Sequence, residues 1–200
     1  MSSSPQKFPA GFTLIEMVVA LGLSLVTVSA VYSLYVNELK AQYVREDRLE
    51  MQQQARVVVD VMSREILMAG YDPRGVNHDT DLSNDFLGIT YDPDRLIIKS
   101  DLNGNGLIAD PNESITFVYD AKTHTLRRNT GGGNQPFGEN VESLLVEYFD
   151  KEGNPTVDST SIRQVKIIVT ARTEDPDPKY VPNGGYRTMT LQSRLTPRNL

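Results

Sequence analysis

The chain has 200 residues, with 20 Lys and Arg against 26 Asp and Glu, and a formal net charge of −6 at pH 7. This length suits one globular domain with an accessory segment, and the mild acidity argues against a nucleic-acid-binding protein, which would carry a basic face. Because the sequence contains no cysteine, a disulfide scaffold, a thiol nucleophile and a Cys-based zinc site are excluded.

The first element is an apolar run over residues 12–36, which follows a short polar leader of residues 1–11. Glu16 is the only charged residue in this run. About 20 helical residues, at about 1.5 Å each, cross the apolar core of a bilayer, which is about 30 Å thick. A secretory signal peptide has a shorter apolar stretch, of about 7–15 residues, before a small-residue cleavage site. The run therefore predicts a transmembrane helix, and a signal peptide and a buried core helix are the alternatives.

The residues that open this run, Gly11-Phe12-Thr13-Leu14-Ile15-Glu16, resemble the cleavage and methylation motif of type IV prepilins and type II secretion pseudopilins. The resemblance implies that a prepilin peptidase cuts between Gly11 and Phe12, and that the new Phe12 amine is then methylated. It also implies that Glu16 is the carboxylate needed for assembly into a filament.

A lone carboxylate inside a membrane helix needs a partner, because an unpaired buried charge is costly. Cleavage would free an ammonium on Phe12, and Glu16 follows at the i,i+4 spacing that puts two groups on one helix face. We therefore expect the Glu16 carboxylate to pair with the Phe12 amine of its own chain or of a neighbouring subunit. The alternative is that Glu16 reaches the lipid headgroups alone.

Membrane orientation follows from the resemblance rather than from charge. Lys7 lies on one side of the run and Lys40, Arg45 and Arg48 lie on the other, so the positive-inside rule gives little help. The resemblance implies a single-pass protein of the bacterial inner membrane, with a cytoplasmic N-terminus and a periplasmic head. Inner-membrane lipid would surround its helix before the protein enters a pilus or pseudopilus.

Residues 37–69 are predicted to continue the helix in amphipathic form and to carry it into the head. They contain neither Pro nor Gly, and their apolar residues recur at helical spacings: Val44, Met51, Ala55, Val58, Met62, Ile66 and Ala69. Gly70 and Pro73 are expected to stop the helix. Many major pilins carry a proline in the membrane half of this helix, whereas no proline occurs here between Pro9 and Pro73. This difference argues against a major pilin.

A second resemblance covers residues 55–73, where an Arg, an apolar helix and the pair Arg64-Glu65 precede Ala69-Gly70-Tyr71. This stretch resembles the one that marks PilW-type minor pilins. The J-type minor pseudopilins of type II secretion are similar, and they form the related alternative.

Residues 70–200 are predicted to form a β-rich head domain. Residues 71–92 are polar and rich in Asp, Asn and Gly, which indicates a long loop. Alternating or β-rich runs separated by Asn-Gly and Gly-rich turns then predict strands over residues 95–99, 114–119, 124–128, 141–149, 163–173 and 186–195. The predicted fold class is α+β and pilin-like: a long N-terminal helix packed on an antiparallel sheet.

The loop after the first predicted strand has oxygen-bearing residues at alternate positions and a Gly at its sixth position, as a calcium loop does. Its twelfth residue is Asn112 rather than Glu, and a strand precedes it, so an EF-hand proper is not expected. A looser calcium loop and a plain Asn-Gly turn between strands both stay open. The candidate ligands are Asp101, Asn103, Asn105, the Leu107 carbonyl, and Asp110 or Glu113. The acidic segment of residues 173–178 is a weaker second candidate.

Function is predicted from these features together. The resemblance implies a minor pilin that helps to initiate a type IV pilus and lies in or near its tip. Its partners would be the prepilin peptidase, other minor pilins and the major pilin, with no nucleic acid indicated. A J-like pseudopilin is the alternative, and a membrane-anchored binding module or enzyme is a third hypothesis. The sequence has no Gly-x-Ser-x-Gly elbow and no titratable cluster around a His, so no enzymatic activity is expected.

Overall fold

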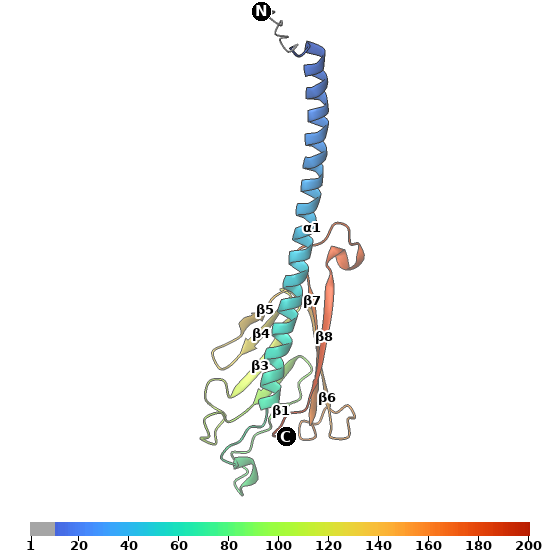
Figure 1. Cartoon of the computed structure of the whole chain (residues 1–200). Coiled ribbons are helices and arrows are strands. Elements are labelled where there is room, and N and C mark those ends of the chain that lie inside the picture. Colours follow the sequence, from blue (N-terminus) through green and yellow to red (C-terminus); the bar gives the residue numbers. More distant parts are fainter. Residues whose placement is uncertain (1–10) are drawn as a thin grey trace, which may run out of the picture. The chain divides into compact units, whose positions relative to one another are not determined.

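The computed structural model describes residues 11–200. They fall into two compact units, one that ends at Arg45 and a head unit of residues 46–200. Helix α1 (Leu14–Met68) begins in the first unit and ends in the head unit (Figure 1). Residues 1–10, which make up most of the predicted leader, lie outside the described residues.

The first unit contains the apolar part of α1. Side chains of residues 12–35 are exposed along the whole run, and α1 is the one helix among the described residues that is long and apolar enough to cross a membrane. Three of its hydroxyl groups do not add unsatisfied polar groups, because Ser24, Thr27 and Ser33 each donate to a backbone carbonyl four residues earlier, at 2.8 to 3.0 Å. Such back-bonding is how Ser and Thr are accommodated in a helix that lies in lipid.

The head unit contains two antiparallel sheets. The first is a five-stranded meander in sequence order, β1-β2-β3-β4-β5. In the register of this sheet, Leu96 pairs with Phe117, which in turn pairs with Arg128. The strands of this sheet are β1 (Ile89–Thr90), β2 (Arg95–Lys99), β3 (Ser114–Asp120), β4 (Thr125–Asn129) and β5 (Gln135–Gly138).

The second sheet has three strands in the order β6-β7-β8, with bounds Val141–Phe149, Gln164–Arg172 and Thr188–Leu195. Along the central strand β7 every second residue is buried, so this strand has one face in the core and one face toward water.

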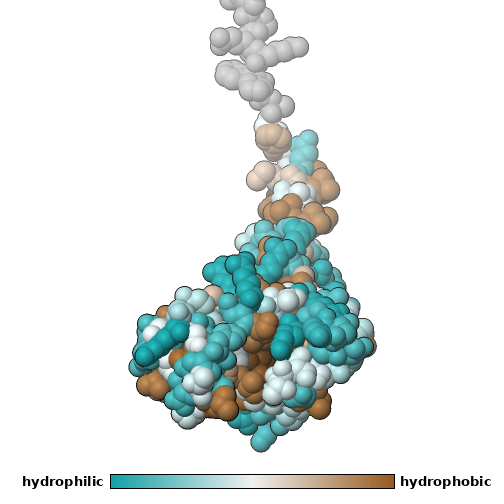
Figure 2. Space-filling model, turned by 90° about the horizontal axis from the view of Figure 1, so that it is seen from below, coloured by the Kyte–Doolittle hydropathy of each residue, from teal (hydrophilic) through white to brown (hydrophobic). Residues whose placement is uncertain are grey.

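The core lies where α1 meets both sheets (Figure 1). Val58, Met62 and Ile66 of α1 are fully buried, and their spacing gives the helix one apolar stripe. They share a cluster with Phe117 of the first sheet and Ile167 of the second. Figure 2 views the head unit from below the orientation of Figure 1. The surface on this side is mainly hydrophilic, with a strip of apolar side chains between two hydrophilic parts.

The predicted fold class is confirmed: one long N-terminal helix packs on antiparallel β-structure. Strands over residues 95–99 and 141–149 have the predicted bounds, and the other four predicted strands differ by one or two residues at an end. Three details differ from the expectation. The strands form two sheets instead of one, β1 lies inside the predicted loop of residues 71–92, and β5 was not predicted.

Helix α1 ends because Gly70 turns the chain. Gly70 has a φ of 74°, a left-handed conformation that favours glycine at a helix end. Its N–H donates to the Lys99 carbonyl at 2.9 Å, and the carbonyl of Tyr71 accepts from the Asp101 N–H at 2.8 Å. The Ala69-Gly70-Tyr71 stretch therefore joins the end of the helix directly to the end of β2.

Gly70 also has no room for a side chain. A Cβ at this position would lie 2.7 Å from the Asn199 carbonyl oxygen and 2.7 Å from a methyl group of Leu200. Gly75 has nearly the same φ, 77°, but nothing lies within 4 Å of the corresponding position. A substitution at Gly75 therefore tests the free-energy cost of the left-handed backbone alone, whereas the same substitution at Gly70 adds the cost of the close approach.

We expect Gly70→Ala to lower the free energy of unfolding by more than Gly75→Ala does. The control carries only the left-handed penalty, about 1–2 kcal/mol, whereas Gly70→Ala must also displace the chain at Asn199. Urea unfolding of the full-length protein in detergent, followed by the near-UV circular dichroism of its tyrosines, measures both. Equal losses in the two variants would contradict the close approach.

Candidate functional site

The residues that carry the prepilin resemblance lie at the very start of α1. Gly11, Phe12 and Thr13 precede the helix, which begins at Leu14. The Phe12 side chain is 87% exposed. The predicted cleavage bond between Gly11 and Phe12 therefore lies in non-helical, exposed backbone, as a peptidase substrate requires.

Thr13 and Glu16 form a capping box at the start of α1. The Thr13 N–H donates to Glu16 Oε2 at 2.8 Å, and the Thr13 hydroxyl donates to the same oxygen at 2.7 Å. In return, the Glu16 N–H donates to Thr13 Oγ1 at 3.3 Å. The first N–H groups of a helix have no partner within it, so this reciprocal pair stabilises the helix start, and a carboxylate there also suits the helix dipole.

The capping box gives Glu16 a role that sequence analysis missed, although the signal was present as Thr-x-x-Glu before an apolar run. The expected partner of Glu16, a free Phe12 amine, does not exist while the Gly11–Phe12 bond is intact. Of the two carboxylate oxygens of Glu16, Oε2 accepts hydrogen bonds, and Oε1 accepts none from the described residues. One carboxylate oxygen therefore holds the helix cap while the other is open to a further donor. The pairing of Glu16 with the Phe12 amine stays a prediction.

The other end of the apolar run carries aromatic side chains. Tyr32 and Tyr35 are 67% and 59% exposed, and tyrosines gather where a membrane helix meets the headgroups. Beyond them Arg45 pairs with Glu38 at 3.4 Å, with both side chains mostly exposed. These features fit a membrane boundary near the end of residues 12–36.

The predicted calcium loop is a turn held by two buried carboxylates. Asp101 and Glu113 are 0% and 1% exposed. The Asp101 carboxylate accepts the N–H groups of Gly104 and Gly106, at 2.7 and 2.8 Å. The Glu113 carboxylate accepts three further backbone N–H groups, at 3.0 to 3.4 Å, which belong to Leu102, Asn103 and Asp110. A buried carboxylate needs such donors in place of water.

The remaining predicted ligands also have protein partners. The side-chain amides of Asn103 and Asn105 both donate to Asp110 Oδ2, at 2.7 and 2.8 Å. The side-chain oxygen of Asn105 accepts the Leu107 N–H at 2.7 Å. The predicted ligands are thus brought together, and the side-chain oxygens of Asp101, Asn103, Asn105 and Glu113 and one oxygen of Asp110 accept hydrogen bonds within the loop. Within residues 11–200 no group of three or more His, Asp or Glu side chains has the arrangement of a metal site. Calcium binding by this loop stays a prediction.

The second acidic candidate, residues 173–178, is part of a compact β7–β8 connection. Asp177 Oδ2 accepts two hydrogen bonds from the Arg187 guanidinium, at 2.8 and 3.0 Å. The Lys179 N–H and then this guanidinium hold the pKa of the Asp177 carboxyl below its usual value. Near the start of the same connection, the Glu174 N–H donates to Asp47 of α1 at 2.9 Å. The Asp177 carboxylate therefore binds the connection to itself, and the Glu174 backbone binds it to the helix.

Comparison with known proteins supports the reading of the N-terminus. Residues 8–32 match the family model described as the prokaryotic N-terminal methylation motif. The chain is therefore type IV prepilin-like in its N-terminal segment, as the resemblance indicated. The match spans residues 8–32 and does not reach residues 55–73, so the PilW-type assignment stays a prediction.

Among solved structures, the chain is similar to a type IV-like pilin from Thermus thermophilus. The identity is 11% and the TM-score 0.45, over 74% of this chain and 97% of that chain. No curated protein sequence matches the chain.

We expect Glu113→Gln to lower the free energy of unfolding by about 1–3 kcal/mol, the range for leaving a buried hydrogen-bonding group unpaired. The amide keeps one acceptor oxygen but turns an N–H₂ group toward backbone N–H donors. Urea unfolding of the full-length protein measures the loss. Glu139→Gln is the matched control, because Glu139 is exposed, and an equal effect in both variants would contradict the role of Glu113.

If the loop binds calcium, millimolar calcium is expected to raise the melting temperature of the wild-type protein, because a ligand that binds only the native state stabilises it. The same concentration of magnesium, which demands a smaller octahedral site, is the ionic-strength control. Asp110→Ala removes a predicted ligand at an exposed position and is expected to reduce the rise. No difference between calcium and magnesium rejects the site.

Proposed function

We propose that this protein is a minor pilin, a structural subunit that helps to initiate assembly of a type IV pilus and lies in or near its tip. The observation that carries the proposal is the methylation-motif match over residues 8–32, which leads directly into a helix that starts at Leu14 and is long enough to cross a membrane. In this role the chain acts by assembly and not by catalysis.

The proposed life cycle begins in the inner membrane. The N-terminus is cytoplasmic, where a prepilin peptidase cuts the exposed bond between Gly11 and Phe12 and the new amine is methylated. The head is periplasmic, and lipid surrounds residues 12–36 until other minor pilins and the major pilin replace it.

Glu16 is proposed to change partners at cleavage. Before the cut, its Oε2 holds the cap made with Thr13. After the cut, the Phe12 ammonium lies one helical turn away, and Oε1 is the oxygen available to it. An ammonium and a carboxylate attract strongly in a medium of low dielectric constant, and either group alone is costly to bury there. The pair therefore favours packing of the processed helix among other helices, where water is excluded.

The minor-pilin role is supported by two features of α1. The helix is unbroken from Leu14 to Met68, without the proline of many major pilins, and it ends in the Ala69-Gly70-Tyr71 turn that resembles PilW-type proteins. A J-like pseudopilin of a type II secretion system has a similar helix and is the alternative.

Three substitutions separate the charge of Glu16 from its capping role. Glu16→Gln keeps an oxygen for the cap but has no charge, Glu16→Ala removes both, and Thr13→Ala removes the cap hydroxyl while it leaves the carboxylate. We expect both Glu16 variants to be processed and inserted normally but to be depleted at least tenfold from sheared filaments. Thr13→Ala is expected to assemble nearly as the wild type does, because a lost cap costs about 1 kcal/mol.

Mass spectrometry of the membrane fraction checks cleavage, and immunoblotting of the sheared fraction measures assembly. Normal recovery of Glu16→Gln together with loss of Thr13→Ala would mean that the cap, not the charge, is what assembly needs. The same strains distinguish the two machines, since loss of pili with normal protein secretion supports a pilus, and the reverse supports the pseudopilin alternative.

A further inference from the structure

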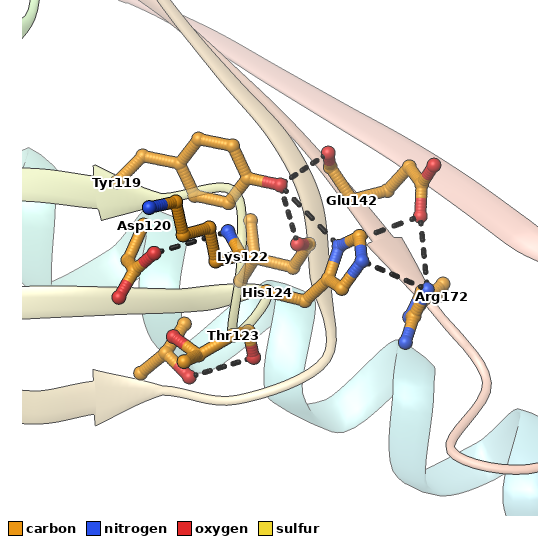
Figure 3. Close-up of polar contacts among 9 residues, drawn as sticks. Tyr119, Asp120, Lys122, Thr123, His124, Glu142 and Arg172 are labelled. Atoms are coloured by element: carbon orange, nitrogen blue, oxygen red, sulfur yellow. Dashed lines mark hydrogen bonds and ion pairs between the residues drawn. The ribbon is translucent and has the colours of Figure 1, made fainter.

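The two sheets of the head unit meet at a cluster of four polar side chains (Figure 3). Tyr119 comes from β3, His124 from the turn between β3 and β4, Glu142 from β6 and Arg172 from β7. The backbone is joined at the same place, because the Val141 N–H donates to the His124 carbonyl at 2.9 Å. The cluster thus connects the first sheet to the second.

The contact between His124 and Arg172 depends on the proton of the imidazole. Nη1 of Arg172 lies 3.2 Å from His124 Nε2. A guanidinium can only donate, so this contact is a hydrogen bond when the imidazole is uncharged, with its proton on Nδ1 and Nε2 as the acceptor. The single proton of the Tyr119 hydroxyl is directed at two carbonyls, that of Glu142 at 2.5 Å and that of Val141 at 3.1 Å. The hydroxyl oxygen, 3.5 Å from His124 Nδ1, is therefore free to accept from the imidazole.

Glu142 forms an ion pair with Arg172 but accepts no hydrogen bond from it. The Oε2 atom of Glu142 is buried and accepts no hydrogen bond from the described residues. It lies 3.6 Å from Arg172 Nη1 and 3.9 Å from His124 Nδ1. Both separations are slightly too long for hydrogen bonds, so a small movement would bring either donor within reach.

We propose that His124 is a proton-responsive connection between the two sheets. While it is uncharged, His124 accepts the hydrogen bond of Arg172. Protonation puts a hydrogen on Nε2, which ends that bond and sets two cations against each other. Arg172 then moves to Glu142 Oε2, and the imidazolium Nδ1–H turns to the same carboxylate. Histidine is the side chain that ordinarily gains a proton between about pH 5 and 8. The connection between the two sheets would therefore change its hydrogen bonds on mild acidification outside the cell.

The other ionisable groups that face His124 come from both sheets. Burial and the nearby Glu142 carboxylate raise the pKa of Tyr119, which keeps its hydroxyl protonated. Asp120, on the same hairpin, is held by the Lys122 N–H at 3.0 Å and lies 3.8 Å from the Arg127 guanidinium. From β6 and β7 the facing charges are those of Glu142 and Arg172.

Nuclear magnetic resonance of the full-length protein in detergent, from pH 8 to pH 5, tests the proposal. The chain has two histidines, so His78→Gln leaves the His124 imidazole as the single titrating ring. The Arg172 guanidinium lies over the Tyr186 ring, 4.3 Å from its centre, so this ring reports movement of Arg172. We expect the Arg172 side-chain and Tyr186 ring signals to shift with the same midpoint as the His124 ring.

His124→Gln is the matched variant, because its amide oxygen can accept from Arg172 at every pH and takes up no proton. In this variant the Arg172 and Tyr186 signals are expected to stay constant from pH 8 to pH 5. The proposal is wrong if these signals do not move while His124 titrates in the His78→Gln protein, or if they move equally in His124→Gln. Should His124→Gln fail to fold, the comparison of midpoints in the His78→Gln protein alone decides the question.

Discussion

The packing of one face of α1 against both sheets is the interaction on which the head unit depends. The two sheets share no strand-to-strand ladder, so apart from the backbone hydrogen bond between Val141 and His124 they are held together by side chains. Val58, Met62 and Ile66 are fully buried and share one cluster with residues of both sheets. Each such side chain contributes about 1.5–3 kcal/mol through burial. Loss of the helix would therefore expose a face of each sheet at once.

The position of the helix end follows from the same packing. Because α1 lies along the sheets, it must stop where the chain can enter β2 and its loop, and Gly70 makes this turn. The Gly70 N–H and the Tyr71 carbonyl are bonded to Lys99 and Asp101. The buried carboxylate of Asp101 then holds the first part of the following loop. The Ala-Gly-Tyr stretch and the acidic loop, which look independent in the sequence, are thus two parts of one connection.

The sequence predicted the elements whose pattern is local. The long helix follows from an apolar run and a helical stripe, and β6 follows from a long β-rich run, so their bounds agree closely with the structure. Strand β1 has only two residues and β5 contains Pro136, which removes a hydrogen-bond donor and weakens a strand prediction. Two sheets were not distinguished from one, because alternation says which face of a strand is buried but not which strands pair.

The same distinction applies to the functional residues. The Thr13-x-x-Glu16 capping box is readable in the sequence, whereas the cost of a charge in a membrane predicts a charged partner, the Phe12 amine, and not the neutral Thr13. The surroundings of His124 were not readable, because its partners lie at positions 119, 142 and 172 and only the meeting of the two sheets brings them together. A histidine between polar neighbours in the sequence gives no sign of such a contact.

Both proposed transitions rest on a carboxylate with one oxygen that accepts no hydrogen bond from the described residues. In Glu16 this oxygen is Oε1, and in Glu142 it is Oε2. An acceptor without a donor is costly where water is excluded, so a new donor gains more there than it would at the surface. For Glu16 cleavage creates the donor as an ammonium, and for Glu142 protonation of His124 releases one that is already 3.6 Å away. The change is larger for Glu16, because its donor is a new charge that peptide cleavage creates, whereas at Glu142 the donor Arg172 exchanges one acceptor of the same cluster for another. The first transition is therefore expected to act as a commitment to assembly, and the second as a reversible adjustment of the head.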